Sequence, residues 1–277
     1  MLHTAADELE DPYYLSIRLG IRRAAEAKRL RLTELFCKDF LRESGDLRAY
    51  SGVLILGESD RWSPACEELL QRVGVPSVLV DFAAQDSAFD CVYTDPRRIA
   101  KTALALFERE TPPRIGYLGA AEDSPFSDRP VPDPRQACFC AWQAARGRLR
   151  PEDVFTAQGA TCDSGYRLAK EALSRSSRPE AFFVMNDSMA IGAYRAIREA
   201  GLRIPQDVEV VGCNDIPSSA YLDPPLTTVR LFPVSIGEIS LRALLDRIEN
   251  GREGRLGLRV EVPCEAVVRG STKTAAD

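Results

Sequence analysis

A strand–helix–strand pattern between residues 181 and 231 limits this chain to a parallel α/β fold. Residues 182–185 form a continuous apolar run, as in a strand buried on both faces, and the run stops at a polar pair. A helical pattern follows and ends at Gly201, because glycine readily adopts the left-handed conformation of a C-cap. A second apolar run, residues 208–212, also leads into a polar pair. We therefore expect two neighbouring parallel strands joined by a helix.

Polar side chains follow both strands at the same edge of the predicted sheet. They are Asn186 and Asp187 after the first strand, and Asn214 and Asp215 after the second. Open α/β sheets bind ligands just outside the carboxyl ends of parallel strands, so all four side chains are candidate ligand contacts. The alternative is that they only cap helices and turns, which is the interpretation we prefer for the two aspartates.

The string NDSMAIGAYRAIREAGLRIPQDVEVVGCNDIPSSAYLDPPLTTV resembles the effector-binding core of the lactose-repressor/galactose-repressor (LacI/GalR) family of bacterial transcription regulators. The family reads N-D-x-M-A-x-G, then G-[IL]-x-[IV]-P-x-D-[IV], then V-G-[FY]-[DN]-D, then P-P-L-T-T-[IV]. The sequence departs from this pattern at Cys213, where the family prefers an aromatic residue. So many ordered matches are more specific than one short motif, and they extend over nearly the whole chain.

The resemblance implies an α/β clamshell like that of periplasmic binding proteins, with two Rossmann-like subdomains joined by a three-stranded hinge. The implied subdomains are residues 1–93 with 232–262, and residues 94–231 with 263–277. The family's first strand is expected to be missing or reduced to residues 2–4. Helices are predicted over residues 12–30, 64–73, 96–109, 163–173 and 234–249.

Two motifs of the family suggest ligand contacts. An N-P-[FY]-[FY] motif, here DPYY, places one aromatic residue against the ligand, which makes Tyr13 and Tyr14 candidates. Arg135 in RQACF matches R-x-x-G-[FWY], whose arginine hydrogen-bonds the effector in many members, because a guanidinium offers a rigid fork of donors. A solvated surface arginine is the alternative.

A carboxylate completes the predicted site. Asp81 follows a predicted strand, where the family has an acidic or polar residue that reaches across the cleft; a turn carboxylate is the alternative. Ala160 stands where many members carry an aromatic residue that stacks on the ligand, which leaves the ligand class open. The predicted ligand contacts are Tyr13, Tyr14, Asp81, Arg135, Asn186 and Asn214.

Composition argues against several other classes of function. A formal charge of −5 argues against direct binding of nucleic acid by this polypeptide. His3 is the single histidine and lies near one end, so a histidine-based catalytic triad is not expected. Paired carboxylates remain the enzyme alternative, with Asp81 and Asp215 as the pair to test. Eight scattered cysteines lack zinc-site spacing, and we expect reduced thiols, no metal and no cofactor.

The expected function is that of a cytoplasmic regulator's effector-binding domain. The N-terminus has no secretion signal and no stretch could span a membrane, which disfavours the alternative, a periplasmic-type sugar receptor of a transport system. By resemblance, the domain forms a homodimer and binds a sugar. The resemblance also implies that operator DNA is bound by a helix-turn-helix that precedes residue 1. The phrase DELEDPYYLSIRLGI is similar to a family member that represses a β-galactosidase operon, which indicates a galactoside.

Overall fold

The computed structural model describes residues 1–3, 12–36, 47–57, 64–83, 89–122, 131–251 and 256–273. The chain forms two compact units. The first is built mainly from Met1–Thr94 and Phe232–Pro263, and the second mainly from Asp95–Asp123, Ser127–Leu231 and Cys264–Asp277. No helix in these described ranges is long and apolar enough to cross a membrane.

A parallel sheet forms the centre of the first unit. Its strand order is β12-β5-β4-β3-β1-β2, and every pairing is parallel. The strands are β1 (Leu2–His3), β2 (Leu35–Phe36), β3 (Val53–Leu56), β4 (Ser77–Val80), β5 (Asp90–Tyr93) and β12 (Arg259–Glu261). The helices are α1 (Pro12–Ala27), α3 (Pro64–Val73) and α8 (Pro233–Asn250), with a 3-10 turn η1 (Leu47–Ala49).

The shortened first strand still takes its place in this sheet. Strand β1 pairs with β3 on one side and with β2 on the other. The prediction of a reduced strand is therefore confirmed for Leu2 and His3, while Thr4 lies outside the described residues.

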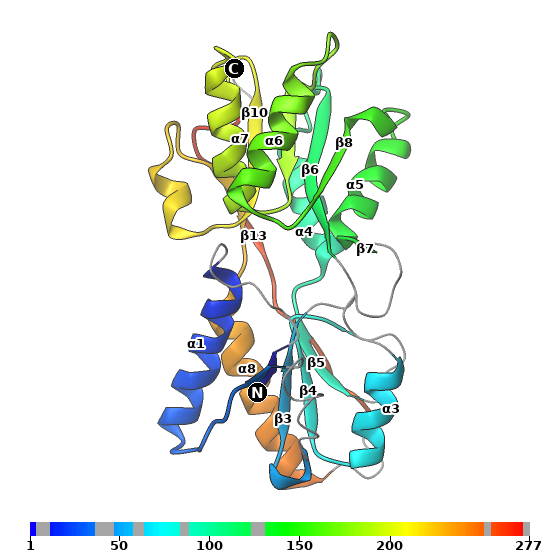
Figure 1. Cartoon of the computed structure of the whole chain (residues 1–277), viewed down its shortest axis with the longest axis vertical. Coiled ribbons are helices and arrows are strands. Elements are labelled where there is room, and N and C mark those ends of the chain that lie inside the picture. Colours follow the sequence, from blue (N-terminus) through cyan, green and yellow to red (C-terminus); the bar gives the residue numbers. More distant parts are fainter. Residues whose placement is uncertain are drawn as a thin grey trace. The chain divides into compact units, whose positions relative to one another are not determined.

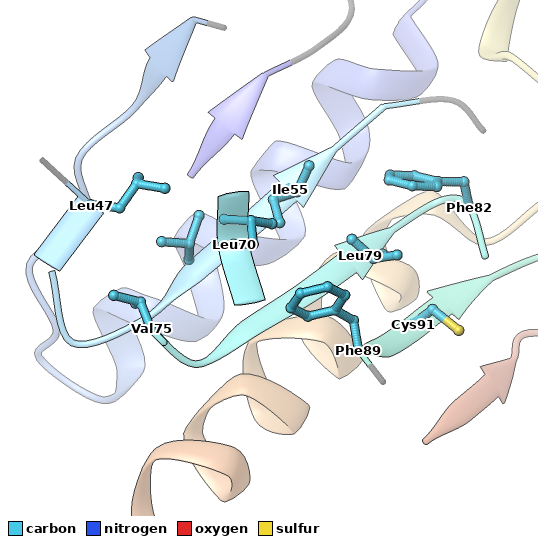
Figure 2. Packing of buried hydrophobic residues seen from close by; sticks show 9 residues of the cluster. Leu47, Ile55, Leu70, Val75, Leu79, Phe82, Phe89 and Cys91 are labelled. Carbon is cyan, nitrogen blue, oxygen red and sulfur yellow. The ribbon is translucent and has the colours of Figure 1, made fainter. Parts of the chain in front are cut away.

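One hydrophobic core of the first unit lies between the sheet and α3. Ile55, Leu79 and Cys91 come from three neighbouring strands and meet Leu70 of α3, as Figure 2 shows. All four side chains are at most 4% exposed. Helix α8 also packs on β3, β4 and β5. Strands β3 and β4 are buried at every position, and this burial explains why their sequences read as continuous apolar runs.

Helices α1 and α8 lie side by side and cross at close range (Figure 1). A Cβ atom on Gly20 would overlap the carbonyl of Val234, and one on Gly237 would overlap the carbonyl of Ile17. Glycine at both positions therefore permits the approach of the two backbones.

Helix α1 ends earlier than predicted. The pattern predicts a helix over residues 12–30, but the last helical residue is Ala27. Arg29 has a left-handed φ of 56°, and the backbone N–H of Leu30 donates to the carbonyl of Ala25 at 2.9 Å. A left-handed residue at this point closes the helix, and no glycine signals it in the sequence.

The second unit holds a mixed sheet. Its strand order is β13-β11-β10-β9-β6-β7, and β8 also pairs with β6. The pairings of β7 and β13 are antiparallel and the others are parallel. The strands are β6 (Ile115–Glu122), β7 (Val131–Pro132), β8 (Val154–Gln158), β9 (Ala181–Val184), β10 (Glu209–Asn214), β11 (Thr227–Arg230) and β13 (Glu265–Val267).

Four α-helices are described in the second unit. They are α4 (Pro96–Ala105), α5 (Pro134–Ala144), α6 (Cys162–Leu173) and α7 (Asp187–Glu199), with 3-10 turns η3 (Pro151–Asp153) and η4 (Pro217–Tyr221). Helices α6 and α7 pack against each other, as Figure 1 shows. The first helical turns of α6 and α7 therefore begin at the carboxyl ends of β8 and β9.

A buried ion pair joins β5 to α8 in the first unit. The side chains of Asp90 and Arg247 are 3% and 4% exposed. The Nε–H of Arg247 donates to one carboxylate oxygen of Asp90 at 2.8 Å, and a terminal N–H donates to the other oxygen. The backbone N–H of Leu258 also donates to Asp90, at 2.7 Å. One carboxylate thus holds β5, α8 and the segment that leads into β12.

We expect Asp90→Asn to destabilise the first unit strongly. The substitution leaves the guanidinium of Arg247 buried without a counter-charge, a change that typically costs about 3–5 kcal/mol. Urea unfolding followed by circular dichroism measures this loss. Asp163→Asn is the matched control, because the Arg167–Asp163 pair is exposed and its loss should cost at most about 0.5 kcal/mol. A loss below about 1 kcal/mol for Asp90→Asn would contradict the prediction.

Candidate functional site

Arg135 lies at the start of α5, and its neighbour Asp133 fixes it there. Asp133 is the N-cap of α5, and its carboxylate accepts a hydrogen bond from the backbone N–H of Arg135 at 2.7 Å. Pro134 occupies the first helical position, where its missing N–H costs nothing. An Asp-Pro pair is a sequence signal for a helix start, so the backbone here follows from local chemistry.

The guanidinium of Arg135 makes four contacts within the second unit. It donates from Nε and from one terminal nitrogen to the two oxygens of Asp133, both at 2.7 Å. The other terminal nitrogen donates to the backbone carbonyl of Met185 at 2.8 Å and lies 3.7 Å from the sulfur of Cys213. Met185 directly follows β9 and Cys213 lies on β10. The side chain is 14% exposed, which excludes a solvated surface arginine.

Among the described residues, the groups that influence the charge of Arg135 are Asp133, Cys213 and Tyr117. Burial disfavours the charged guanidinium, but the charge and hydrogen bonds of Asp133 outweigh it and raise the pKa of Arg135 well above its usual value. Burial raises the pKa of the Cys213 thiol to about 12. Burial also raises the pKa of the Tyr117 phenol well above its ordinary value. One cation and one anion therefore remain, and they are paired.

Tyr117 lies buried beside this pair, and sequence reasoning missed it. It belongs to β6, and its ring packs on Phe139 and Phe183 with centroid distances of 5.5 Å. The ring extends along the strand over Gly119, where a Cβ atom would overlap the ring and its hydroxyl. The hydroxyl is fully buried and has no hydrogen-bond partner among the described residues. A tyrosine within an apolar strand gives no sequence signal that its hydroxyl reaches a polar site.

Asn186 caps helix α7, as the alternative interpretation proposes. Its side-chain oxygen accepts from the backbone N–H of Met189 at 2.8 Å, and its amide nitrogen donates to the carbonyl of Ala160 at 3.1 Å. The residue is 4% exposed. A ligand contact of Asn186 stays a prediction, and the amide already has partners on both of its polar atoms.

Asp187 is a fully buried carboxylate that connects three segments. It accepts hydrogen bonds from the backbone N–H of Ile216 at 2.9 Å, the hydroxyl of Ser219 at 2.7 Å and the hydroxyl of Thr228 at 2.7 Å. Burial raises the pKa of Asp187 to about 7, although these hydrogen bonds oppose the shift. The preferred interpretation of Asp187 as a structural residue agrees with these contacts, but it is Asn186 that caps the helix.

The end of β10 has an unusual backbone. Asn214 and Asp215 have φ angles of 107° and 55°, in the region that non-glycine residues seldom occupy. The two oxygens of Asp215 accept from Arg230 at 2.7 Å and from Arg269 at 2.6 Å. Asp215 is thus a turn carboxylate held by two arginines. The turn presents the half-buried Asn214 at the carboxyl edge of the sheet.

The first unit brings three predicted contacts together. The hydroxyl of Tyr13 donates to the carboxylate of Asp81 at 2.6 Å, and the rings of Tyr13 and Tyr14 meet edge to face with centroids 5.5 Å apart. Asp81 has a φ of 75°, which is uncommon for this residue type, and it directly follows β4. Tyr13 is 9% exposed, and Tyr14 and Asp81 are half-buried.

The second unit brings the other three predicted contacts to one edge of its sheet. Arg135 touches Met185 and Cys213, which are the chain neighbours of Asn186 and Asn214. All of them lie where the parallel strands β9 and β10 end. This edge is where open α/β sheets bind ligands. No group of three or more histidine, cysteine or acidic side chains in the described part of the chain could hold a metal ion.

Known proteins share both the sequence pattern and the fold. The family described as periplasmic binding protein-like domain matches residues 105–272. The chain is 31% identical to the HTH-type transcriptional repressor MelR of Bacillus subtilis (strain 168), over 95% of this chain and 75% of that protein. It is 32% identical to the HTH-type transcriptional regulator GalR of Lacticaseibacillus casei, over 96% of this chain and 78% of that protein.

Solved structures confirm the predicted fold class. The transcriptional regulator CelR–cellobiose complex superposes with a TM-score of 0.77 at 24% identity, covering 98% of this chain and 83% of that chain. A LacI family transcriptional regulator from Enterococcus faecium with bound ribose gives a TM-score of 0.76 at 22% identity, covering 98% of both chains. At these identities the likeness establishes the fold alone.

We expect Asp187→Asn to weaken the pH dependence of unfolding. Folding raises the pKa of Asp187 to about 7, from about 3.9 in the unfolded chain, so the folded state holds this proton more tightly. The stability that this site contributes is therefore complete below about pH 4, declines as the pH rises, and is lost above about pH 7. Between the low-pH and high-pH limits, the contribution of Asp187 to the free energy of unfolding changes by on the order of 4 kcal/mol.

Urea unfolding at several pH values between about 4 and 8 gives the slope of the free energy of unfolding against pH. An asparagine amide can replace the carboxylate, because the rotatable hydroxyl of Thr228 is able to accept from it. Asp163→Asn, at an exposed position, is the control and should keep the slope of the parent protein. Equal slopes in the parent protein and in Asp187→Asn would contradict the prediction.

Proposed function

Because the chain belongs to the LacI/GalR family of transcriptional regulators, as its effector-binding domain, we propose that it binds a sugar at Arg135 and signals to a DNA-binding helix-turn-helix outside this chain. The observation that carries the proposal is the position of Arg135. Its guanidinium is held at the carboxyl ends of β9 and β10, where this class of sheet binds small molecules.

Several features favour a sugar as the effector. Two proteins with the same fold hold cellobiose and ribose. Hydroxyl groups both donate and accept, which suits a site that offers arginine donors, a carboxylate and the amide of Asn214. Galactosides are the first compounds to test, because the N-terminal sequence resembles that of a regulator of a β-galactosidase operon.

The proposed ligand contacts come from both units. Arg135, Asn186 and Asn214 belong to the second unit, and we assign Tyr13, Tyr14 and Asp81 of the first unit to the same ligand. A ligand shifts a conformational equilibrium of the domain by no more than the difference in its affinity for the two states.

Regulation, rather than catalysis or transport, is the role that the relatives support. The two relatives at 31% and 32% identity are transcriptional regulators, which favours regulation over a transport receptor. We propose that the chain catalyses no reaction on its ligand, since both oxygens of Asp215 are held by arginines. We propose a cytoplasmic location, because the proposed DNA partner lies in that compartment.

We expect a homodimer in solution. The resemblance implies dimerisation through effector-binding domains, and the outer face of α1 carries Leu15 and Leu19, which are 50% and 41% exposed. Exposed apolar side chains on one helix face are typical of a surface that another molecule covers. Sedimentation velocity at micromolar concentration measures the mass, and a monomer over the whole concentration range would overturn this expectation.

A thermal-shift screen with mono- and disaccharides tests the proposed sugar site. A sugar at a hundred times its dissociation constant should stabilise the protein by about 2.7 kcal/mol, which raises the melting temperature visibly. Arg135→Ala should weaken binding of that sugar by about 1–3 kcal/mol, measured by titration calorimetry on the folded variant.

Arg195→Ala provides the matched control, because this arginine belongs to the same unit and its side chain is 72% exposed. Arg195→Ala should bind the sugar as the parent protein does. Unchanged affinity in Arg135→Ala would remove Arg135 from the site. A screen in which no sugar stabilises the protein would overturn the proposed sugar effector.

A further inference from the structure

We propose that Asp133 is a specificity-determining residue, which restricts the ligand at Arg135 to an uncharged hydroxyl compound and excludes carboxylates and phosphates. The proposal rests on the proposed function, in which Arg135 contacts the effector. It concerns one property of that site, its preference between neutral and anionic ligands.

The hydrogen bonds of Arg135 are the first argument. Arginine recognises carboxylates and phosphates best through two parallel N–H groups. Asp133 already occupies such a pair, the Nε–H and one terminal N–H, both at 2.7 Å. The other terminal nitrogen faces the carbonyl of Met185 and the sulfur of Cys213. These contacts account for four of the five N–H groups, so no parallel pair is left for an incoming anion.

The remaining hydrogen-bonding capacity fits a hydroxyl group. Within the described part of the chain, Arg135 keeps one N–H without a partner, on the terminal nitrogen that also donates to Asp133. One oxygen of Asp133 accepts from both the backbone N–H and the Nε–H of Arg135, whereas the other accepts from a single terminal N–H. The pair therefore offers one donor and one acceptor. A hydroxyl can use both, while a carboxylate ligand has nothing to donate.

Electrostatics points in the same direction. In the described ranges, the ionisable groups that influence the guanidinium are Asp133, Tyr117 and Cys213. Tyr117 and Cys213 are buried and uncharged at neutral pH, so Asp133 is the described residue whose charge balances Arg135. The Asp133 side chain is 16% exposed. A ligand anion that approaches Arg135 meets a cation that is already neutralised and, directly beside it, the partly exposed carboxylate of Asp133, so it gains less attraction than a lone guanidinium would give.

The substitution Asp133→Asn removes the negative charge of residue 133 while keeping its role as the helix cap. Asparagine caps a helix as well as aspartate does, so the start of α5 should be kept. The substitution removes the counter-charge of Arg135. It also weakens the pair of hydrogen bonds that residue 133 accepts along one edge of the guanidinium. Asp207→Asn is the matched control, because Asp207 pairs with Arg203 at 2.9 Å in the same unit and the variant has the same net charge.

The experiment compares neutral sugars with closely related anionic compounds. Thermal shift and calorimetry are run on the whole chain with D-galactose and D-galacturonate, D-glucose and D-glucuronate, and D-ribose and D-ribose 5-phosphate. The parent protein should bind a neutral sugar at least about tenfold more tightly than its anionic counterpart. Asp133→Asn should shift that ratio toward the anion at least about tenfold, and Asp207→Asn should not.

Inorganic phosphate is a second probe that does not depend on the identity of the sugar. Phosphate stabilises most proteins by exclusion from their surface, an effect that all variants share. Asp133→Asn should show an additional, saturable stabilisation that the double variant with Arg135→Ala loses. Its absence would overturn the role of Asp133 even where a sugar binds.

The outcomes separate the two proposals. Equal binding of a sugar and its acid by the parent protein, or an unchanged ratio in Asp133→Asn, would overturn the role of Asp133 and leave the sugar function standing. Failure of the parent protein to bind any mono- or disaccharide of the thermal-shift screen, these six compounds included, would overturn the sugar function and the selectivity that rests on it.

Discussion

The buried carboxylate of Asp187 is the contact on which the edge of the second unit depends. It receives hydrogen bonds from the turn after β10 and from β11, while Asn186 beside it caps α7. Gly212 is necessary for this arrangement, since a Cβ atom there would overlap an oxygen of Asp187. One short polar pair therefore sets where β9 stops, where α7 begins and how β10 leaves the sheet.

In the first unit, carboxylates of other residues also link separate helices and strands. Asp90 and Arg247 are both buried and hold β5, α8 and the chain before β12 together. Asp81, at the end of β4, receives the hydroxyl of Tyr13 from α1. Carboxylates at or near strands thus link separate elements in both units. The burial of Asp90 and Asp187 makes their links costly to break, because an unpaired partner would be left without water.

Apolar runs predicted much of the fold, because a parallel sheet covered on both faces requires them. The helix predicted over residues 64–73 coincides with α3, whereas the one predicted over residues 96–109 ends at Ala105. Helix ends depend on individual backbone angles, which periodicity does not encode. The family pattern pointed to Arg135 but not to its partners. Asp133 reads as a simple cap in the sequence, and only the folded chain shows its carboxylate turned onto the guanidinium.

The partners of Arg135 also lower the cost of ordering the site when a sugar binds. A guanidinium that is already fixed by Asp133 and Met185 loses little conformational freedom on binding, so less of the interaction energy is spent on ordering the site. On the proposed function, that energy remains available to favour one conformation of the domain over another. A mobile arginine would bind its ligand more weakly for the same contacts. The pre-formed pair at the start of α5 therefore serves affinity and selectivity together.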